Sequence, residues 1–176
     1  AQARKDAQAT IDALSQKSTD AIRQEISLLQ SQSANGISNI GKISSAYDRL
    51  IAALSKRKGL LVESGAEEQE VLKVSTELLE AQTNKLEFYN GAIEAATKSL
   101  DELRADVKNG VANEEDLNQA NSVLIALLEE RLKLQKEILE IQKKEGASPA
   151  AVQKTQAAIR QTEKDIGAAK AGPNNV

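Results

Sequence analysis

The chain has 176 residues, of which 28% are charged and 2% aromatic, and its formal net charge at pH 7 is −3. It contains no cysteine and no histidine, which excludes disulfides, thiol or histidine catalysis and the usual ligands of zinc, iron–sulfur and haem sites. So small a negative charge gives no electrostatic reason to expect nucleic acid as a partner. No stretch approaches the roughly 18 consecutive apolar residues of a transmembrane helix, so we expect no integral membrane segment.

The apolar side chains are mainly those of leucine, isoleucine, valine and alanine, because the only aromatic residues are Tyr47, Phe88 and Tyr89. This composition is typical of long helices and coiled coils. The sequence therefore predicts an all-α fold, in which long amphipathic helices form an elongated antiparallel helical bundle or coiled coil. We expect one elongated helical domain over residues 1–172 and a flexible tail over 173–176. Since methionine is absent, we also expect a processed product or an excised segment.

A first long helix is expected over residues 3–63. Its second half carries a regular apolar stripe, Ile37, Ile40, Tyr47, Ile51, Leu54 and Leu61, and its first half a weaker one. The step Asn35-Gly36 is a candidate turn, because both residues tolerate the left-handed conformation that ends helices. Glycine inside a helix costs only about 1 kcal/mol, however. We therefore favour an unbroken or merely kinked helix, with a hairpin at this step as the alternative.

The next helix is expected over residues 66–108, and Ser64 followed by Glu67 resembles a capping box at its start. Apolar residues recur here at every seventh position, and we call them the heptad series: Leu72, Leu79, Leu86, Ile93, Leu100 and Val107. A series of this regularity predicts a helix-packing seam. The alternative is an ordinary amphipathic helix within a bundle. Phe88, one step to the side of Tyr89, is the best single candidate for contact with a partner chain.

A third helix is expected over residues 113–145, with Asn113 and the acidic residues after it as a capping box. It has a first seam, Leu124, Leu127, Leu134, Ile138 and Ile141, and a second seam, Ile125, Leu128, Leu132 and Leu139. Two seams require neighbours on two sides. The helix expected over residues 66–108 is one of these neighbours. The other is one of the two halves of the helix expected over residues 3–63, the last helix, or another copy of the chain. Arg131 falls in the first seam, where it either fixes the register or packs its stem and extends its head to water.

The last helix is expected over residues 149–171, with Ser148 as its N-cap and Pro149 in its first turn. The acidic runs at 67–70 and 113–116 lie in first helical turns, where the helix dipole favours them, and they lack the spacing of a calcium loop. The basic triplet Lys56-Arg57-Lys58 is expected to form a solvated face near a helix end. We therefore expect no catalytic residue, no cofactor and no metal site.

The segments AQARKDAQATIDALSQK (1–17) and LLEERLKLQKEILEIQKK (127–144) resemble the helical repeats of bacteriophage tail tape-measure proteins. This resemblance implies a structural chain whose helical length matters more than any single residue. The sequence as a whole predicts a non-catalytic structural or interaction protein. It would act by helix–helix association with itself or another helical chain, for example as a phage-tail-like scaffold segment. The alternative is a secreted or periplasmic helical bundle serving as a filament subunit, an adhesin or a toxin component.

Overall fold

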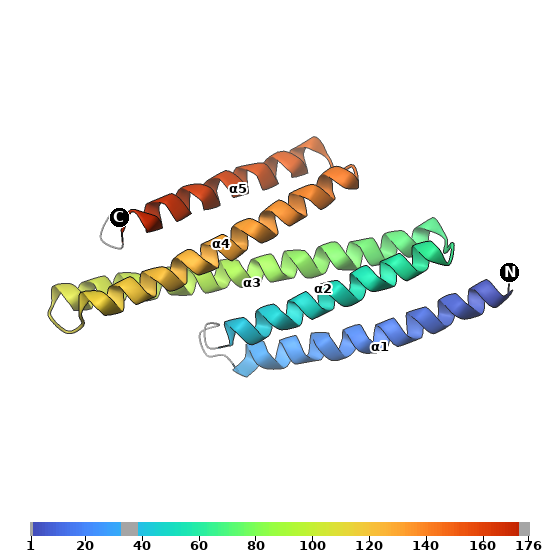
Figure 1. Ribbon diagram of the computed structural model, residues 1–176, viewed down its shortest axis with the longest axis horizontal. Helices are drawn as coiled ribbons and strands as arrows, with labels where there is room; N and C mark the ends of the chain where they lie inside the picture. The colour runs from blue at the N-terminus through green and yellow to red at the C-terminus, as the bar shows by residue number, and fades with distance from the viewer. Residues whose placement is uncertain (1, 33–38, 173–176) are drawn as a thin grey trace. The chain divides into compact units, whose positions relative to one another are not determined.

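The computed structural model describes residues 2–32 and 39–172. Over these residues the chain is all-α, with five helices and no strand, which confirms the all-α part of the predicted fold class. The helices are α1 (Gln2–Gln32), α2 (Ile40–Glu63), α3 (Glu68–Lys108), α4 (Glu114–Lys144) and α5 (Pro149–Lys170), as Figure 1 shows. The tail expected over residues 173–176 lies outside the described residues.

Helices α1 and α2 are separate and pack against each other, as the ribbon in Figure 1 also shows. The expectation of one unbroken helix over residues 3–63 is therefore corrected. The physical reason lies in the apolar stripe of α2, in which Ile43 and Leu54 are 0% exposed. Side-by-side packing covers such a stripe, and a continuous rod would not. The step Asn35-Gly36 itself lies outside the described residues.

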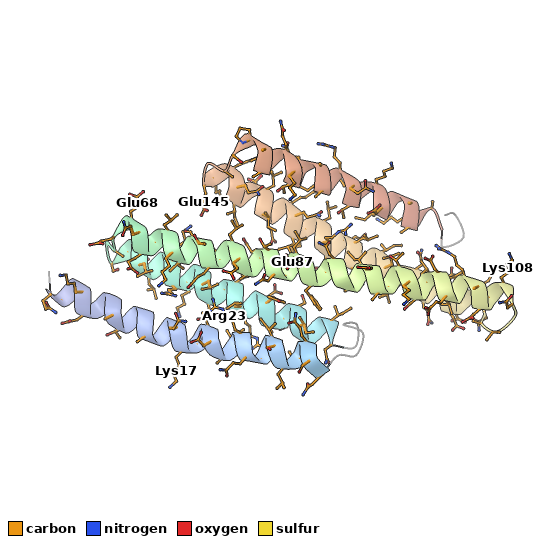
Figure 2. The ribbon with its side chains drawn as sticks, turned by 180° about the vertical axis from the view of Figure 1, so that it is seen from behind. Lys17, Arg23, Glu68, Glu87, Lys108 and Glu145 are labelled. Carbon is orange, nitrogen blue, oxygen red and sulfur yellow. The ribbon has the colours of Figure 1, made fainter. Side chains whose placement is uncertain are left out.

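The chain divides into two compact units: Ala1–Lys85, here called unit 1, and Leu86–Val176, here called unit 2. The single elongated domain expected over residues 1–172 stays a prediction. Unit 1 contains α1, α2 and the first part of α3. Unit 2 contains the rest of α3 with α4 and α5. Helix α3 is continuous over 41 residues, with Glu68 and Lys108 at its two ends in Figure 2. Because the boundary falls within a helix, no turn signal marks it in the sequence.

Ser64 ends α2 and does not start α3, so the capping box expected at Ser64 and Glu67 is a wrong prediction. The Ser64 N–H donates to the Leu60 carbonyl at 2.9 Å, and its hydroxyl donates to the Leu61 carbonyl at 3.0 Å. Gly65 follows with φ 71°, the left-handed conformation that glycine adopts without strain. These bonds satisfy the last carbonyls of α2, and α3 begins only at Glu68.

The starts of α4 and α5 have the caps that the sequence indicates. The Asn113 side chain accepts a hydrogen bond from the Asp116 N–H at 2.9 Å, and the Asp116 carboxylate accepts one from the Asn113 N–H at 3.4 Å. The Ser148 hydroxyl accepts a hydrogen bond from the Ala151 N–H at 3.2 Å, with Pro149 in the first turn. Each cap satisfies a backbone donor that the helix cannot, which is worth about 1 kcal/mol.

Each unit has its own buried aliphatic residues. In unit 1 the most deeply buried include Ile43, Leu50, Leu54, Leu61 and Val74. In unit 2 they include Leu100, Leu117, Leu127, Leu128 and Leu134. Each such side chain stabilises its unit by about 1.5–3 kcal/mol through removal of its surface from water.

Candidate helix-association surfaces

The heptad series of α3 is covered unevenly along the helix. Ile93 and Leu100 are buried in unit 2, at 8% and 2% exposure, and Val107 is half-buried. Leu79 and Leu86 are half-buried. Leu72 is 62% exposed, so its place in a helix-packing seam stays a prediction.

The cause is that the first part of α3 turns a different side toward its neighbours in unit 1. The buried residues there are Val74, Ser75, Ala81, Gln82 and Lys85, which are mainly small or polar. The Gln82 Oε1 atom is buried and accepts no hydrogen bond from the described residues. The larger apolar residues of the heptad series are thus left near the surface on the other side of the helix.

Four residues on that outer side form a line without charge, and we call it the α3 stripe: Leu72, Thr76, Leu79 and Thr83. Successive members are four, three and four residues apart, the spacing that places side chains on one side of a helix. Leu72, Thr76 and Thr83 are exposed and Leu79 is half-buried. The Thr76 hydroxyl already donates a hydrogen bond to the Leu72 carbonyl at 3.0 Å, so covering this residue would leave no donor unsatisfied. The stripe is therefore a surface that another helix could cover at little polar cost.

Both seams of α4 pack, to different depths. In the first seam Leu124, Leu127, Leu134 and Ile138 are buried and Ile141 is half-buried. In the second seam Leu128 is buried, whereas Ile125, Leu132 and Leu139 are half-buried. Helix α5 packs directly against α4. The last segment is therefore one of the two neighbours that the two seams required.

Arg131 joins all three helices of unit 2. Its Nε donates to the Thr162 hydroxyl of α5 at 3.1 Å, its Nη2 lies 3.3 Å from the Asp165 carboxylate, and its Nη1 donates to the Asn90 side-chain oxygen of α3 at 3.1 Å. Its side chain is 14% exposed. The guanidinium is therefore held by specific partners and is not simply extended into water, whereas a role in fixing register stays a prediction.

Two further polar contacts attach α5 to α4 in the interior. The Thr162 hydroxyl, at 0% exposure, donates to the Gln135 side-chain oxygen at 2.8 Å. The Asn121 side-chain amide donates to the Ala169 carbonyl at 2.9 Å. The Ala169 carbonyl lies in the last turn of α5 and also accepts a hydrogen bond from the Gly172 N–H at 3.2 Å, so Asn121 adds a second donor to it.

A groove of about 350 Å³ lies beside this contact in unit 2. Its lining includes Leu100 of α3, Leu124 and Leu128 of α4, and Ala168 and Ala169 of α5. The hollow forms where the small side chains of Ala168 and Ala169 in α5 lie opposite leucines. Its charged lining residues are Asp101, Arg104 and Asp165, of which Arg104 bonds to Asp101 at 2.7 Å and Asp165 pairs with Arg131. Opposite charges already neutralise one another there.

Buried cations are the main feature of unit 1 that the sequence did not indicate. Arg57 is 4% exposed and its Nη1 lies 3.2 Å from the Glu77 carboxylate. The expectation that Lys56-Arg57-Lys58 forms a solvated face is thus wrong for its central residue. Lys85, at 8% exposure, pairs with Asp48 at 2.5 Å. Both pairs tie α2 to α3, and long aliphatic stems let such cations enter a helix interface.

One ion pair has a resolved effect on titration. The Arg49 guanidinium donates to the Glu25 carboxylate at 2.6 Å, joining α2 to α1. This hydrogen bond lowers the pKa of Glu25 and raises the pKa of Arg49 from their ordinary values. Both side chains are about half exposed, so solvent and salt screen the interaction.

Phe88, the proposed partner contact, is half-buried. Its ring meets that of Tyr89 edge to face, with centroids 5.7 Å apart. Tyr89 itself is 3% exposed. A contact of Phe88 with another chain stays a prediction.

Among the described residues, no three side chains of the metal-ligating acidic, histidine or cysteine types gather where they could hold an ion. None of the helices in residues 2–32 and 39–172 combines the length and hydropathy needed to cross a bilayer. Comparison of the chain with known protein families, characterised proteins and solved structures gives no match.

Proposed function

We propose that the chain is a non-catalytic interaction protein that associates through the α3 stripe with another helix, in the first place with a second copy of itself. The observation that supports this is the position of Leu72. It stands in the heptad series with Ile93 and Leu100, which are packed, yet it is 62% exposed. An apolar series that is covered at one end and open at the other is what a helix with one further partner would show.

The stripe offers a useful amount of binding free energy. Full burial of a leucine side chain is worth about 1.5–3 kcal/mol, so covering the exposed part of Leu72 would contribute about 1–2 kcal/mol. No charge would have to be desolvated along the stripe, and the net charge of −3 repels a second copy only weakly. Several such contacts per copy would be needed for a stable complex.

Within this proposal the helices pair as antiparallel coiled coils. The order of contacts supports the orientation: Asn121 bonds to Ala169 and Arg131 to Thr162, so residue numbers fall along α5 as they rise along α4. In unit 1, Asp48 pairs with Lys85 and Arg57 pairs with Glu77, so residue numbers likewise fall along α3 as they rise along α2. The same kind of contact would serve in a scaffold segment such as the tape-measure resemblance implies.

Sedimentation velocity of three proteins at one concentration tests the role of the stripe: the wild type, Leu72→Ser and the control Val111→Ser. Val111 is 76% exposed and lies outside the stripe. We expect Leu72→Ser to weaken self-association by about 1–2 kcal/mol per copy, roughly five- to thirty-fold, and Val111→Ser to leave it unchanged. Equal weakening by both substitutions would show that exposed apolar surface in general, and not the stripe, holds copies together.

A further inference from the structure

Helix α5 has fewer fully buried residues than α4, and directed polar bonds join the two helices. The buried residues of α5 among those described are Ile159, Thr162 and Ala169, whereas α4 has eight. Two of the three, Thr162 and Ala169, take part in hydrogen bonds to α4. Since few of its residues are fully buried, α5 is the helix of unit 2 that we expect to separate most readily.

The polar contacts form a matched set that recognises the sequence of α5. Arg131 requires a hydroxyl and a carboxylate three residues apart, which Thr162 and Asp165 provide. The Asn121 side-chain amide donates to the Ala169 carbonyl, which lies two turns after Thr162 in the last turn of α5. These bonds depend on the two helices and not on the loop between them. The helix that fits α4 best in another molecule is therefore the α5 of a second copy.

The connection between the two helices is a short turn that can serve as a hinge. Glu145 and Gly146 end α4, and Gly146 has φ 68°. A Cβ at Gly146 would meet nothing within 4 Å, so there is space for a side chain at this position. A substitution there would be unfavourable only because of the positive φ. A change of backbone conformation at this residue would redirect the chain and carry α5 away from its own α4. Short hinges of this kind are where protein domains exchange elements between copies.

We propose that α5 is an exchangeable helix, which docks either on α4 of its own chain or, through the same contacts, on α4 of a second copy. The two states share the α4–α5 interface and differ in the hinge. Concentration and the conformation of Gly146 therefore set the balance between them. This exchange is independent of the α3 stripe.

Charge exchange between two variants tests the proposal. In the Arg131→Glu variant, two carboxylates face each other at positions 131 and 165 of one chain. In the Asp165→Arg variant, two guanidinium groups face each other at the same positions. In a mixed pair that exchanges α5, each α4 instead meets an α5 of opposite charge at this position, because the introduced glutamate faces the introduced arginine and the unchanged Arg131 faces the unchanged Asp165. We expect the mixture to form a heterodimer of twice the 18.9 kDa chain mass, in at least ten-fold excess over the dimer that either variant forms alone.

The matched control is Arg131→Glu mixed with Asp20→Arg. The second variant also replaces an aspartate by arginine, but at an exposed position of α1. The ion-pair partner of Asp20 is Arg23 of the same helix. This mixture restores no contact between α4 and α5, so we expect no heterodimer. Circular dichroism of each variant shows whether it is folded before mixing.

A second measurement uses the unmodified chain and so does not depend on the folding of variants. Lys170 Nζ lies 3.2 Å from the Glu129 carboxylate across the α4–α5 contact, close enough for a zero-length carbodiimide to join them. In an equal mixture of ¹⁴N- and ¹⁵N-labelled chains, exchange predicts Glu129–Lys170 cross-links that combine both labels, and more of them in Gly146→Ala. Mixed cross-links should persist in Leu72→Ser, which separates this proposal from the role of the α3 stripe. Cross-links confined to single labels at every concentration, in both wild type and Gly146→Ala, would overturn the proposal.

Discussion

The strongest quantitative prediction compares the same substitution at two positions of the heptad series. Leu100 is 2% exposed and lies in the interior of unit 2, whereas Leu72 is 62% exposed. Leucine-to-alanine changes at buried sites cost about 2–5 kcal/mol, through lost transfer free energy and the cavity left behind. Leu100 borders the groove of unit 2, so part of its cavity opens to water and we expect the lower half of that range, about 2–3 kcal/mol.

For Leu72 the expected cost is smaller because little of its surface is removed from water by folding. Its alanine variant loses about 0.8 kcal/mol for each methylene that is buried, and less than half of the side chain is buried. We therefore expect Leu72→Ala to lower the free energy of unfolding of the monomer by less than about 1 kcal/mol.

Urea titration can follow each unit separately, because Tyr47 belongs to unit 1 and Tyr89 to unit 2, and the chain contains no tryptophan. A Tyr47→Phe background leaves Tyr89 as the fluorescent reporter for Leu100→Ala. With a denaturant slope of about 1–3 kcal/mol/M, the midpoint for unit 2 should fall by about 0.7–3 M. In a Tyr89→Phe background Leu72→Ala should move the midpoint of unit 1 only slightly. Equal costs at the two positions would show that the inner and outer sides of α3 are wrongly assigned.

Three further predictions concern stability. Gly59→Ala in α2 and Gly91→Ala in α3 should each raise the free energy of unfolding by about 0.5–1 kcal/mol in urea titrations. The reason is that a Cβ at either helical position meets nothing within 4 Å. A loss of stability would mean that these positions are crowded. Gln82→Leu should raise the urea midpoint of unit 1, because it replaces a buried oxygen that lacks a hydrogen bond, and a lowered midpoint would mean that Gln82 has a partner. The hydrogen bond from Arg49 lowers the pKa of Glu25 in the folded state. The pair therefore stabilises the fold at pH values above the pKa that Glu25 has in the unfolded chain, and this stabilisation is lost as the pH falls through the pKa of Glu25 in the folded state. The difference in thermal midpoint between wild type and Glu25→Gln should therefore shrink on acidification and in high salt, and a difference that grows in acid would contradict the assignment.

Local signals in the sequence were sufficient for the helical class and for two of the helix starts. Asn113 and Ser148 could be assigned as caps because the residues that they bond lie three positions away in the chain. Ser64 shows where such signals are ambiguous. A serine followed by glycine also fits the end of a preceding helix, and the positive φ of Gly65 decides in favour of the end.

The depth of burial along α3 could not be predicted from its periodicity. A heptad series shows which residues share a side of a helix, but not which neighbour covers that side. Leu72 and Leu100 occupy equivalent positions in the series and differ because α3 contributes to two units with different neighbours. Because the division lies within a continuous helix, no glycine or proline marks it.

The buried polar residues were missed for a similar reason. Arg57 and Lys85 look like surface residues in the sequence, and only their pairing with Glu77 and Asp48 across α2 and α3 accounts for their burial. Arg131 could be recognised, because it interrupts an apolar seam. Its partners on α5 could not be identified from sequence alone, since they lie more than thirty residues away.

The most direct test of the central claim is the weight-average mass of the unmodified chain in sedimentation equilibrium, from micromolar to millimolar concentration. Association through the α3 stripe predicts a mass that rises from 18.9 kDa toward twice that value, with a midpoint shifted to higher concentration in Leu72→Ser. A mass that stays at 18.9 kDa over the whole range would contradict self-association as the function of this chain.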